Sequence, residues 1–368
     1  MTRLPPKNSQ PCYNCQPSSE VMQKRNPSSG RPGHHYIDRE SGRLVEEVLF
    51  QDEIVSFIYS QIREKTPLLF KSLTSRRFTA LLGYINYDAP FLNFVTGSER
   101  MAAKLNLDLS ECLEDPQSLD TPRKIFERKI RYWEIRPLPS DPAAIVSPAD
   151  ARIILGSFSR QSVLFIKDKF FSFAELIGKK KWQAVFFRGD FAIFRLTPDK
   201  YHYNHMPVSG RVVDIFTLDG AFNSCNPDAV ISVITPYSKN RRVVTIIDSD
   251  VDGGSRVGRV AMVEVVAMMI GGIRQCYSGK KYDCPQPVVK GLFVEKGKPK
   301  SLYRPGSSTD ILIFEPHRIK FADDLVSNQK RVACSRFSDG FMQPLLETDV
   351  KLRSLIAYPA EPERKKND

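Results

Sequence analysis

From about residue 141 to residue 314 the chain consists of short β-branched and aromatic runs, and this pattern limits the folds that it can adopt. Gly, Pro and Asn separate the runs at fairly regular intervals. Such spacing is typical of antiparallel sheets, in which tight turns join neighbouring strands. The expected strands are Ala151–Phe158, Ser162–Ile166, Ala184–Phe187, Phe191–Leu196, Gly210–Thr217, Val230–Thr235, Val243–Ile247, Val257–Ile270, Val288–Val294 and Asp310–Phe314.

The part of the chain that precedes these runs has a helical pattern. Apolar residues in Phe50–Ile62 recur at spacings of three and four, as on one face of a helix. A second apolar segment, 68–84, includes Lys71 and two arginines, which suits an interfacial helix and equally a helix pair packed on the core. Thr121-Pro122 places an N-cap before proline at the first helical position and predicts a helix to about Trp133.

The sequence therefore predicts an α+β protein, with a helical N-terminal region followed by a largely antiparallel β-rich domain. The expected parts are a disordered tail (1–34), a mainly helical region that could face a membrane (35–140), a β-rich catalytic core (141–320), and a C-terminal extension with a charged tail (321–368). Ser172–Gly178 is expected as a short helix between strands, and Tyr36–Gly42 as a short turn.

Composition narrows the classes of partner and the compartment. The 54 Lys and Arg exceed the 42 Asp and Glu, a net charge of +12 that attracts nucleic acid or an anionic membrane. No nucleic-acid-binding motif accompanies the charge, so the anionic membrane is the favoured partner and nucleic acid is not expected. Seven scattered cysteines indicate reduced thiols, and no apolar run reaches the ~18 residues of a membrane span. We expect a cytoplasmic protein, soluble or peripheral to the membrane.

The turn Gly306–Thr309, just before an apolar run, could support cleavage of the chain by itself. If a base takes the proton of Ser308, its Oγ can attack the carbonyl carbon of Ser307 and convert the amide into an ester. β-Elimination of that ester would cut the chain between residues 307 and 308 and leave dehydroalanine, which hydrolyses to a pyruvoyl group and ammonia. The reaction requires strain in the turn and a nearby base.

Two histidines and one aspartate are candidates for that base and its orienting group. His202 and His205 follow the apolar run Phe191–Leu196, and Asp150 lies in a turn before its own strand. A histidine base works best when a carboxylate orients it. The same residues could instead be surface imidazoles, or a set of two histidines and one aspartate that holds zinc.

Three motifs, in this order, resemble those of the phosphatidylserine decarboxylase family, which makes its own pyruvoyl cofactor. They are Ser147-Pro148-Ala149-Asp150, Tyr201-His202-Tyr203-Asn204-His205-Met206-Pro207 and Ser307-Ser308-Thr309, with weaker similarity from about Tyr36 to Glu315. The resemblance implies that Asp150, His205 and Ser308 form a self-processing triad, with His205 as base and Asp150 orienting it. It implies that His202 acts in decarboxylation, that the cofactor is a pyruvoyl group derived from Ser308, and that no metal takes part.

The match departs from the family pattern at the cleavage site. Ser307 stands where family members usually carry glycine, so a cut between Gly306 and Ser307 is the alternative register. We prefer the Ser307–Ser308 bond because six residues then separate Ser308 from Phe314, as in the family. The bulkier Ser307 would slow the acyl shift.

The expected function is decarboxylation of phosphatidylserine to phosphatidylethanolamine and CO2 at an anionic membrane surface. The resemblance implies that the processed chains 1–307 and 308–368 stay associated, and that the protein forms a homodimer. Two alternatives are a related decarboxylase of a free amino acid and an unprocessed lipid-binding protein without activity.

Overall fold

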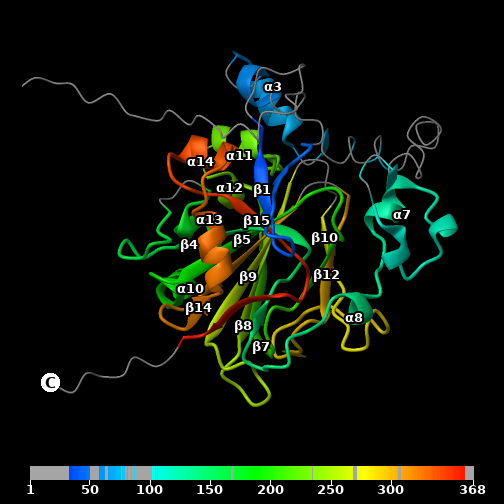
Figure 1. The fold of residues 1–368 in the computed structure, drawn as a ribbon, viewed down its shortest axis with the longest axis vertical. Coiled ribbons are helices and arrows are strands. Elements are labelled where there is room, and N and C mark those ends of the chain that lie inside the picture. The colour runs from blue at the N-terminus through cyan, green and yellow to red at the C-terminus, as the bar shows by residue number, and fades with distance from the viewer. Residues whose placement is uncertain are drawn as a thin grey trace, which may run out of the picture. The chain divides into compact units, whose positions relative to one another are not determined.

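The computed structural model describes residues 33–49, 107–166, 170–233, 235–267, 272–305 and 308–360, with short pieces between 58 and 105 (Figure 1). Residues 1–32 of the predicted disordered tail, Ser307 and part of the predicted helical segments between 50 and 87 therefore lie outside the described residues. The last residue of the predicted tail, His34, is described and is buried.

A ten-stranded sheet runs through the described residues, in the order β11-β7-β8-β9-β13-β5-β4-β15-β1-β2. Neighbours are antiparallel except β1 and β15, which are parallel. The strands in chain order are β1 (His35–Asp38), β2 (Leu44–Glu46), β4 (Ala151–Ser157), β5 (Asp190–Leu196), β7 (Gly210–Leu218), β8 (Arg242–Asp248), β9 (Arg259–Val266), β11 (Phe293–Val294), β13 (Ser308–Phe314) and β15 (Glu347–Val350). Strand β13 lies in the middle, between β9 and β5.

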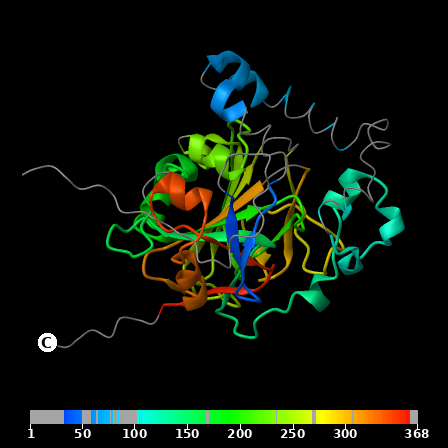
Figure 2. The same cartoon turned by 45° about the horizontal axis from the view of Figure 1, so that its top comes forward.

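Both faces of this sheet are covered, which explains why its central strands are almost continuously apolar. One face packs on buried side chains of short helices, such as Trp182 and Phe337. The other face packs on two three-stranded sheets through residues such as Tyr303 and Phe321. Figures 1 and 2 show β10 and β12 on one side of the large sheet and α10 and α14 on the other, whereas α13 packs on the face of the small sheets through Leu325. The small sheets are β10 (Ile273–Gln275), β12 (Pro299–Tyr303) and β6 (Tyr203–His205), and β14 (Ile319–Phe321), β16 (Leu355–Pro359) and β3 (Ile145–Val146).

The described helices are all short. They are α3 (Pro67–Leu73), α7 (Pro122–Phe126), α8 (Tyr132–Ile135), α9 (Phe173–Ile177), α10 (Lys180–Phe186), α11 (Pro227–Ser232), α12 (Pro236–Lys239), α13 (Asp323–Gln329) and α14 (Arg336–Phe341), with a π-helix at Ile58–Ile62 and 3-10 turns at Leu109–Glu111 and Pro116–Ser118. Among the described residues, no helix has the length and apolar character needed to cross a bilayer.

The predicted α+β class is confirmed, and most predicted strands correspond to observed ones. The predicted helix at Ser172–Gly178 is α9, with Ser172 as its N-cap. The predicted helix after Thr121 is also present, but it ends at Phe126. Ile130 then forms a bridge with Cys112, and α8 begins only at Tyr132.

Two predicted strands are wrong because they are helices. Ala184–Phe187 belongs mainly to α10, where Trp182 and Phe186 are buried four residues apart on one helical face. Val230–Thr235 begins inside α11, which Asn226 caps and Pro227 opens. Asparagine followed by proline is a helix-start signal, and here it outweighs the β-branched residues that follow.

Three further predictions differ in detail. The predicted turn at Tyr36–Gly42 contains β1, which forms a hairpin with β2. Ser162–Ile166 contributes a single bridge at Phe165, and Val288–Val294 contributes only the two residues of β11. The division of the chain at residues 140 and 320 stays a prediction.

Candidate active site

Ser308 is the first residue of β13 and is fully buried. Its register partners are Leu196 on β5 and Val266 on β9, so strands on both sides hold its backbone. Its Oγ has no hydrogen-bond partner among the described residues. Ser307 lies outside those residues, so the structure describes the predicted cleavage bond only on its C-terminal side.

His205 is buried at the end of β6, and both ring nitrogens are engaged. Nδ1 lies 3.0 Å from the carbonyl oxygen of Gly297, and Nε2 lies 3.0 Å from the hydroxyl of Tyr201. Because a carbonyl only accepts hydrogen bonds, Nδ1 carries the hydrogen and Nε2 offers a lone pair. Burial lowers the pKa of His205 to about 3, so the ring is neutral at neutral pH and can accept a proton.

Asp150 lies on the loop before β4 and is held by cationic and backbone donors. Arg136 donates two hydrogen bonds to its carboxylate, at 3.0 and 2.9 Å, and the N–H of Leu352 donates a third at 2.6 Å. Burial opposes ionisation, but the hydrogen bonds and charge of Arg136 hold the pKa of Asp150 below its usual value.

Asp150 and His205 are brought together by backbone contact and by charge. The N–H of His205 donates to the carbonyl of Pro148, two residues before Asp150, at 2.8 Å. The charge of Asp150 raises the pKa of His205 against the larger effect of burial. Gly297, however, supplies the hydrogen bond that orients the imidazole. The triad role of Asp150 stays a prediction.

His202 differs from His205 because its ring nitrogens make no hydrogen bond of standard geometry within the described part of the chain, although the backbone of Lys200 lies close enough to favour the charged ring. The ring is fully buried and stacks on Phe126 of α7, with 3.6 Å between the ring centroids. Burial, reinforced by the nearby positive charge of Arg128, lowers the pKa of His202 to about 3. A buried imidazole without hydrogen bonds of standard geometry is costly, which is typical of a residue kept for chemistry.

Other unpaired buried atoms occur on the same strands as these residues. Oδ1 of Asn204 on β6 and Oδ2 of Asp310 on β13 have no partner among the described residues. Most buried polar groups in folded proteins are paired, so such a group of exceptions needs an explanation. It marks the ends of β5 and β6 and the start of β13 as the candidate active site.

Asp310 and Glu264 are site residues that the sequence reasoning missed. They are register partners on β13 and β9, and both are buried. Glu264 pairs with Lys300 at 2.5 Å, whereas Asp310 accepts one hydrogen bond from the hydroxyl of Tyr303 at 2.8 Å. Burial, and then the charge of Glu264, raises the pKa of Asp310 well above its usual range. A lone acidic residue inside an apolar strand is a signal that could have identified both.

The residues named above are not arranged as a metal site. Both ring nitrogens of His205 and both carboxylate oxygens of Asp150 already contact protein groups. The described residues place His34, Glu47 and Glu347 close enough to hold an ion, but Arg195 donates to both of those carboxylates and neutralises them.

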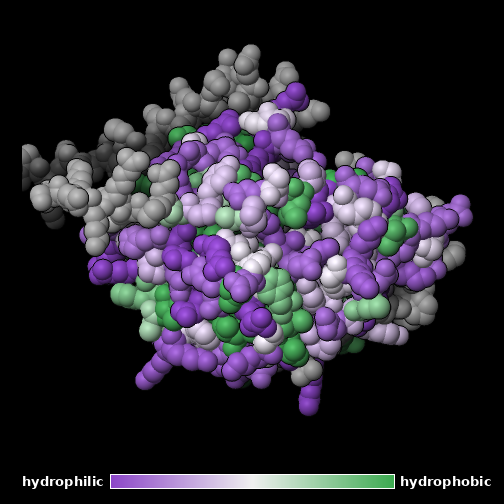
Figure 3. Space-filling view, turned by 90° about the horizontal axis from the view of Figure 1, so that it is seen from below, coloured by the Kyte–Doolittle hydropathy of each residue, from purple (hydrophilic) through white to green (hydrophobic). Residues whose placement is uncertain are grey.

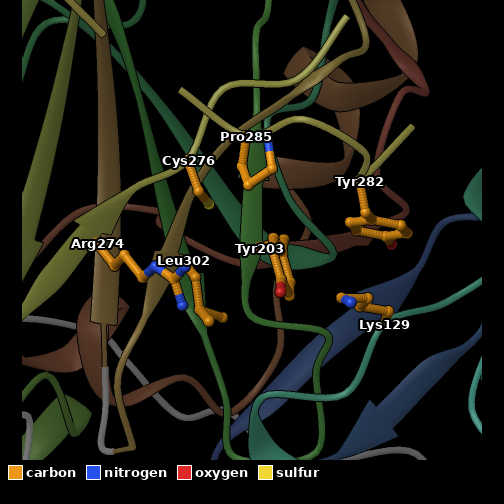
Figure 4. A pocket seen from close by; sticks show the side chains of 7 residues that line it. All are labelled: Lys129, Tyr203, Arg274, Cys276, Tyr282, Pro285 and Leu302. Carbon is orange, nitrogen blue, oxygen red and sulfur yellow. The ribbon is translucent and has the colours of Figure 1, made fainter. Parts of the chain in front are cut away.

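A cavity of about 120 Å³ lies next to β6, on the face of the small sheet that carries Tyr203. Arg274, Leu302 and Tyr203 are successive register partners across β10, β12 and β6. Figure 4 shows their side chains with those of Cys276, Lys129, Tyr282 and Pro285 around the cavity. Tyr282 connects this cavity to the candidate site, since its hydroxyl lies 2.7 Å from that of Tyr201.

Comparison with known proteins gives one consistent result. The family model described as phosphatidylserine decarboxylase matches residues 123–337. A phosphatidylserine decarboxylase proenzyme of Bordetella petrii is 31% identical over 238 residues, which cover 61% of this chain and 79% of the relative. One from Chlamydia trachomatis is 27% identical over 292 residues, covering 79% and 90%. Proenzyme 3 of Schizosaccharomyces pombe is 28% identical over 298 residues, covering 80% of this chain and 29% of the relative.

Proposed function

Because this chain belongs to the phosphatidylserine decarboxylase family, we propose that it is a self-processing, pyruvoyl-dependent enzyme that converts phosphatidylserine to phosphatidylethanolamine and CO2. The observation that carries the proposal is the condition of Ser308. Its side chain is buried, its Oγ is unpaired among the described residues, and its backbone is held between two strands. These features suit a serine that is converted into a cofactor in place.

Self-cleavage is assigned to Ser308, with His205 as base. The neutral ring of His205 accepts a proton, and the charge of Asp150 stabilises the cation that results. Oγ of Ser308 attacks the carbonyl carbon of Ser307, and the peptide C–N bond breaks as the ester forms. Elimination then breaks the Cβ–O bond of residue 308, and hydrolysis of the dehydroalanine releases ammonia and leaves the pyruvoyl group.

Decarboxylation is assigned to the same place. A pyruvoyl group at residue 308 would condense with the substrate amine and accept the electron pair that remains when CO2 leaves. His202 is assigned the transfer of a proton to the α-carbon, because its ring is buried and its nitrogens make no hydrogen bond of standard geometry with the described residues.

An anionic membrane is the proposed surface on which the lipid is met. Helix α3 exposes Leu68, which is 82% accessible, and Leu69 beside Lys71. Exposed leucines next to a cation suit the boundary between lipid headgroups and acyl chains. The face seen from below in Figure 3 is mainly hydrophilic, with smaller hydrophobic areas between the polar side chains. A cytoplasmic location and a homodimer stay predictions.

Intact-mass analysis tests self-processing and the position of the cut. Wild-type protein should yield chains 1–307 and 308–368, the smaller with a blocked N-terminus. Ser308→Ala should remain one uncut chain, while Ser307→Ala should still be cut at the same bond. Cleavage of Ser308→Ala would move the cut to Gly306–Ser307, and an uncut wild-type chain would favour the unprocessed lipid-binding alternative.

Release of CO2 tests the substrate. Vesicles that contain phosphatidylserine and a panel of free amino acids, serine included, are compared with equal amounts of processed enzyme. The wild-type enzyme should release CO2 from the vesicles and not from the free amino acids, and Ser308→Ala should release none from either. Turnover of a free amino acid without turnover of the lipid would identify the protein as a soluble amino-acid decarboxylase of the same chemistry.

A further inference from the structure

A chain of hydroxyl groups leads from His205 to the cavity beside β6. The hydroxyl of Tyr201 lies 3.0 Å from Nε2 of His205 and 2.7 Å from the hydroxyl of Tyr282. The hydroxyl of Tyr282 also lies 3.1 Å from the N–H of Ile130 and 2.9 Å from its carbonyl oxygen. His205 and Tyr201 are fully buried, whereas Tyr282 is partly exposed and lines the cavity (Figure 4).

The chain of hydroxyl groups has one consistent set of hydrogen bonds when His205 is neutral. Gly297 requires the hydrogen to be on Nδ1, so Nε2 accepts and Tyr201 donates. The oxygen of Tyr201 can then accept from Tyr282, whose own oxygen accepts from the N–H of Ile130. Every proton on this path has an acceptor.

The same atoms make a second complete set when His205 carries a proton on Nε2. That N–H donates to Tyr201, Tyr201 donates to Tyr282, and Tyr282 donates to the carbonyl of Ile130. Only the two hydroxyl hydrogens rotate, and no heavy atom has to move. The two hydroxyl groups can therefore complete the hydrogen bonds of His205 in both of its protonation states, although the ring is fully buried.

We propose that Tyr201 is a positioning residue for His205. Because Nε2 already accepts from Tyr201, the proton that this buried base takes up reaches Nε2 through the Tyr201 hydroxyl, and it returns to the cavity through Tyr201 and Tyr282. This inference rests on the proposed function of His205 in self-cleavage. On return, the proton on Nε2 moves to Tyr201 as Tyr201 passes its own to Tyr282. The hydroxyl of Tyr282 then turns away from the carbonyl of Ile130 and releases one proton to solvent in the cavity that its side chain lines, so the charge leaves the site and both phenols end neutral.

The surroundings of His205 make such help necessary. The ring of Tyr132 lies roughly perpendicular to the imidazole, with 4.6 Å between the ring centroids. Arg353 opposes protonation of His205, and Asp150 favours it without touching it. Burial raises the pKa of the Tyr201 phenol well above its usual range, so a free phenolate is not formed and the transfers must be concerted.

Tyr203 provides a matched control. It stacks on Tyr201 with 5.4 Å between ring centroids and lines the same cavity, but its hydroxyl makes no hydrogen bond within the part of the chain that the structure describes. Tyr→Phe at residues 201, 282 and 203 removes one oxygen from each of three neighbouring rings. Only the first two belong to the hydroxyl chain.

The first measurement is the rate of self-cleavage of the full chain, followed from the moment of cell-free synthesis. We expect Tyr201→Phe to be slower by about 100-fold, the size of a general-base contribution, and Tyr282→Phe by about 10-fold. Tyr203→Phe should stay within twofold of wild type. A Tyr201→Phe rate within threefold of wild type, or an equal loss in Tyr203→Phe, would overturn the proposal. If Tyr201→Phe does not fold, the rate of Tyr282→Phe decides in the same way.

The second measurement is the ¹⁵N spectrum of histidine-labelled Ser308→Ala protein, which does not depend on cleavage. His205, assigned by loss of its signals in His205→Gln, should show a hydrogen on Nδ1 and a hydrogen-bonded Nε2. Tyr201→Phe should move the Nε2 signal to the position of a free imine nitrogen, and Tyr203→Phe should not. An unchanged Nε2 signal overturns the inference, whereas a wild-type chain that never cleaves overturns the proposed function alone.

Discussion

Two buried polar regions lie on either side of strand β5, and they are built in opposite ways. In the first, Arg195 on β5 donates to Glu347 on β15 at 2.9 and 2.6 Å and to Glu47 at the same two distances. Glu347 also contacts the ring of His34 at 2.8 Å. In the second, around Ser308 on β13, buried side-chain atoms have no partner among the described residues.

The difference separates groups that hold the fold from groups that are available for a reaction. Every charge in the first region, the Arg195 cluster, is matched by hydrogen bonds, so it fixes β5, β15 and the hairpin of β1 and β2 relative to one another. The second region leaves Ser308, His202 and Asp310 incompletely paired, at a cost to stability. Substitution of Arg195 should therefore lower the free energy of unfolding, whereas substitution of the incompletely paired residues should raise it. These stability predictions refer to the Ser308→Ala chain, which is not cleaved.

Arg195→Met should have the largest effect. It leaves the carboxylates of Glu47 and Glu347 buried beside each other without their shared cation, and we expect a loss of about 3–5 kcal/mol in the free energy of unfolding. Denaturant unfolding measures it. Lys320→Met is the control, because Lys320 and its partner Asp323 are 67% and 81% exposed, and its loss should stay below about 1 kcal/mol. Equal losses in the two variants would contradict the comparison.

Asp310→Asn should stabilise the protein, and more so as the pH rises. Burial, and then Glu264, raises the pKa of Asp310 well above its ordinary 3.8, so the unfolded chain loses this proton near pH 4 while the folded chain keeps it. Each further pH unit then costs the folded state about 1.4 kcal/mol, a cost that asparagine removes while still accepting from Tyr303.

Unfolding at pH 5, 6 and 7 measures this gain. Glu264→Gln is the matched contrast on the neighbouring strand, because it removes the partner of the buried Lys300 and should destabilise at every pH. A gain for Asp310→Asn that does not change with pH would show that Asp310 is ionised in the folded protein.

His202→Phe should have a smaller effect that is confined to acid. Burial lowers the pKa of His202 from 6.5 to about 3, so below pH 6.5 the unfolded chain binds a proton that the folded chain does not. Stability is thereby lost as the pH falls, by about 2 kcal/mol at pH 5 for this one residue. The variant should recover that amount at pH 5 and differ from its parent by less than about 1 kcal/mol at pH 8.

His205→Phe is the contrast to His202→Phe. It removes the same loss of stability in acid, and it also removes two hydrogen bonds. It should therefore be less stable than its parent at pH 8. Equal stability of the two histidine variants at pH 8 would show that the hydrogen bonds of His205 contribute nothing. In the chain that can still cleave, His202→Phe should lose turnover of the lipid.

The sequence predicts the parts of this fold that rest on long apolar runs. Strand β13 is fully buried and β5 and β8 are almost entirely buried, so their apolar pattern is strong enough to identify them. The residues Asp150, His202, His205 and Ser308 are identified by the resemblance of three short motifs to the phosphatidylserine decarboxylase family, and their roles stay predictions. Short apolar runs such as Ala184–Phe187 fit helix and strand equally, and there the prediction fails.

What could not be predicted depends on contacts between distant parts of the chain. Tyr201 and Tyr282 are 81 positions apart, and neither has a neighbour in sequence that indicates the other. Arg136 precedes Asp150 by 14 positions, but their hydrogen bonds depend on how α8 and the loop before β4 pack together. Pairing of this kind is a property of the tertiary structure.

The position of β13 determines when a cut before Ser308 can occur. The segment from 308 to 360 supplies β13 between β9 and β5, and β15 between β4 and β1, so the two pieces of chain are interleaved strand by strand. Neither piece alone gives its strands the neighbours that they need. If the newly made chain were cut before it folded, neither piece could form the complete sheet. We therefore expect self-cleavage to begin only after the whole chain has folded. Expression of residues 1–307 and 308–368 from two separate genes should then yield less folded protein than expression of one continuous precursor.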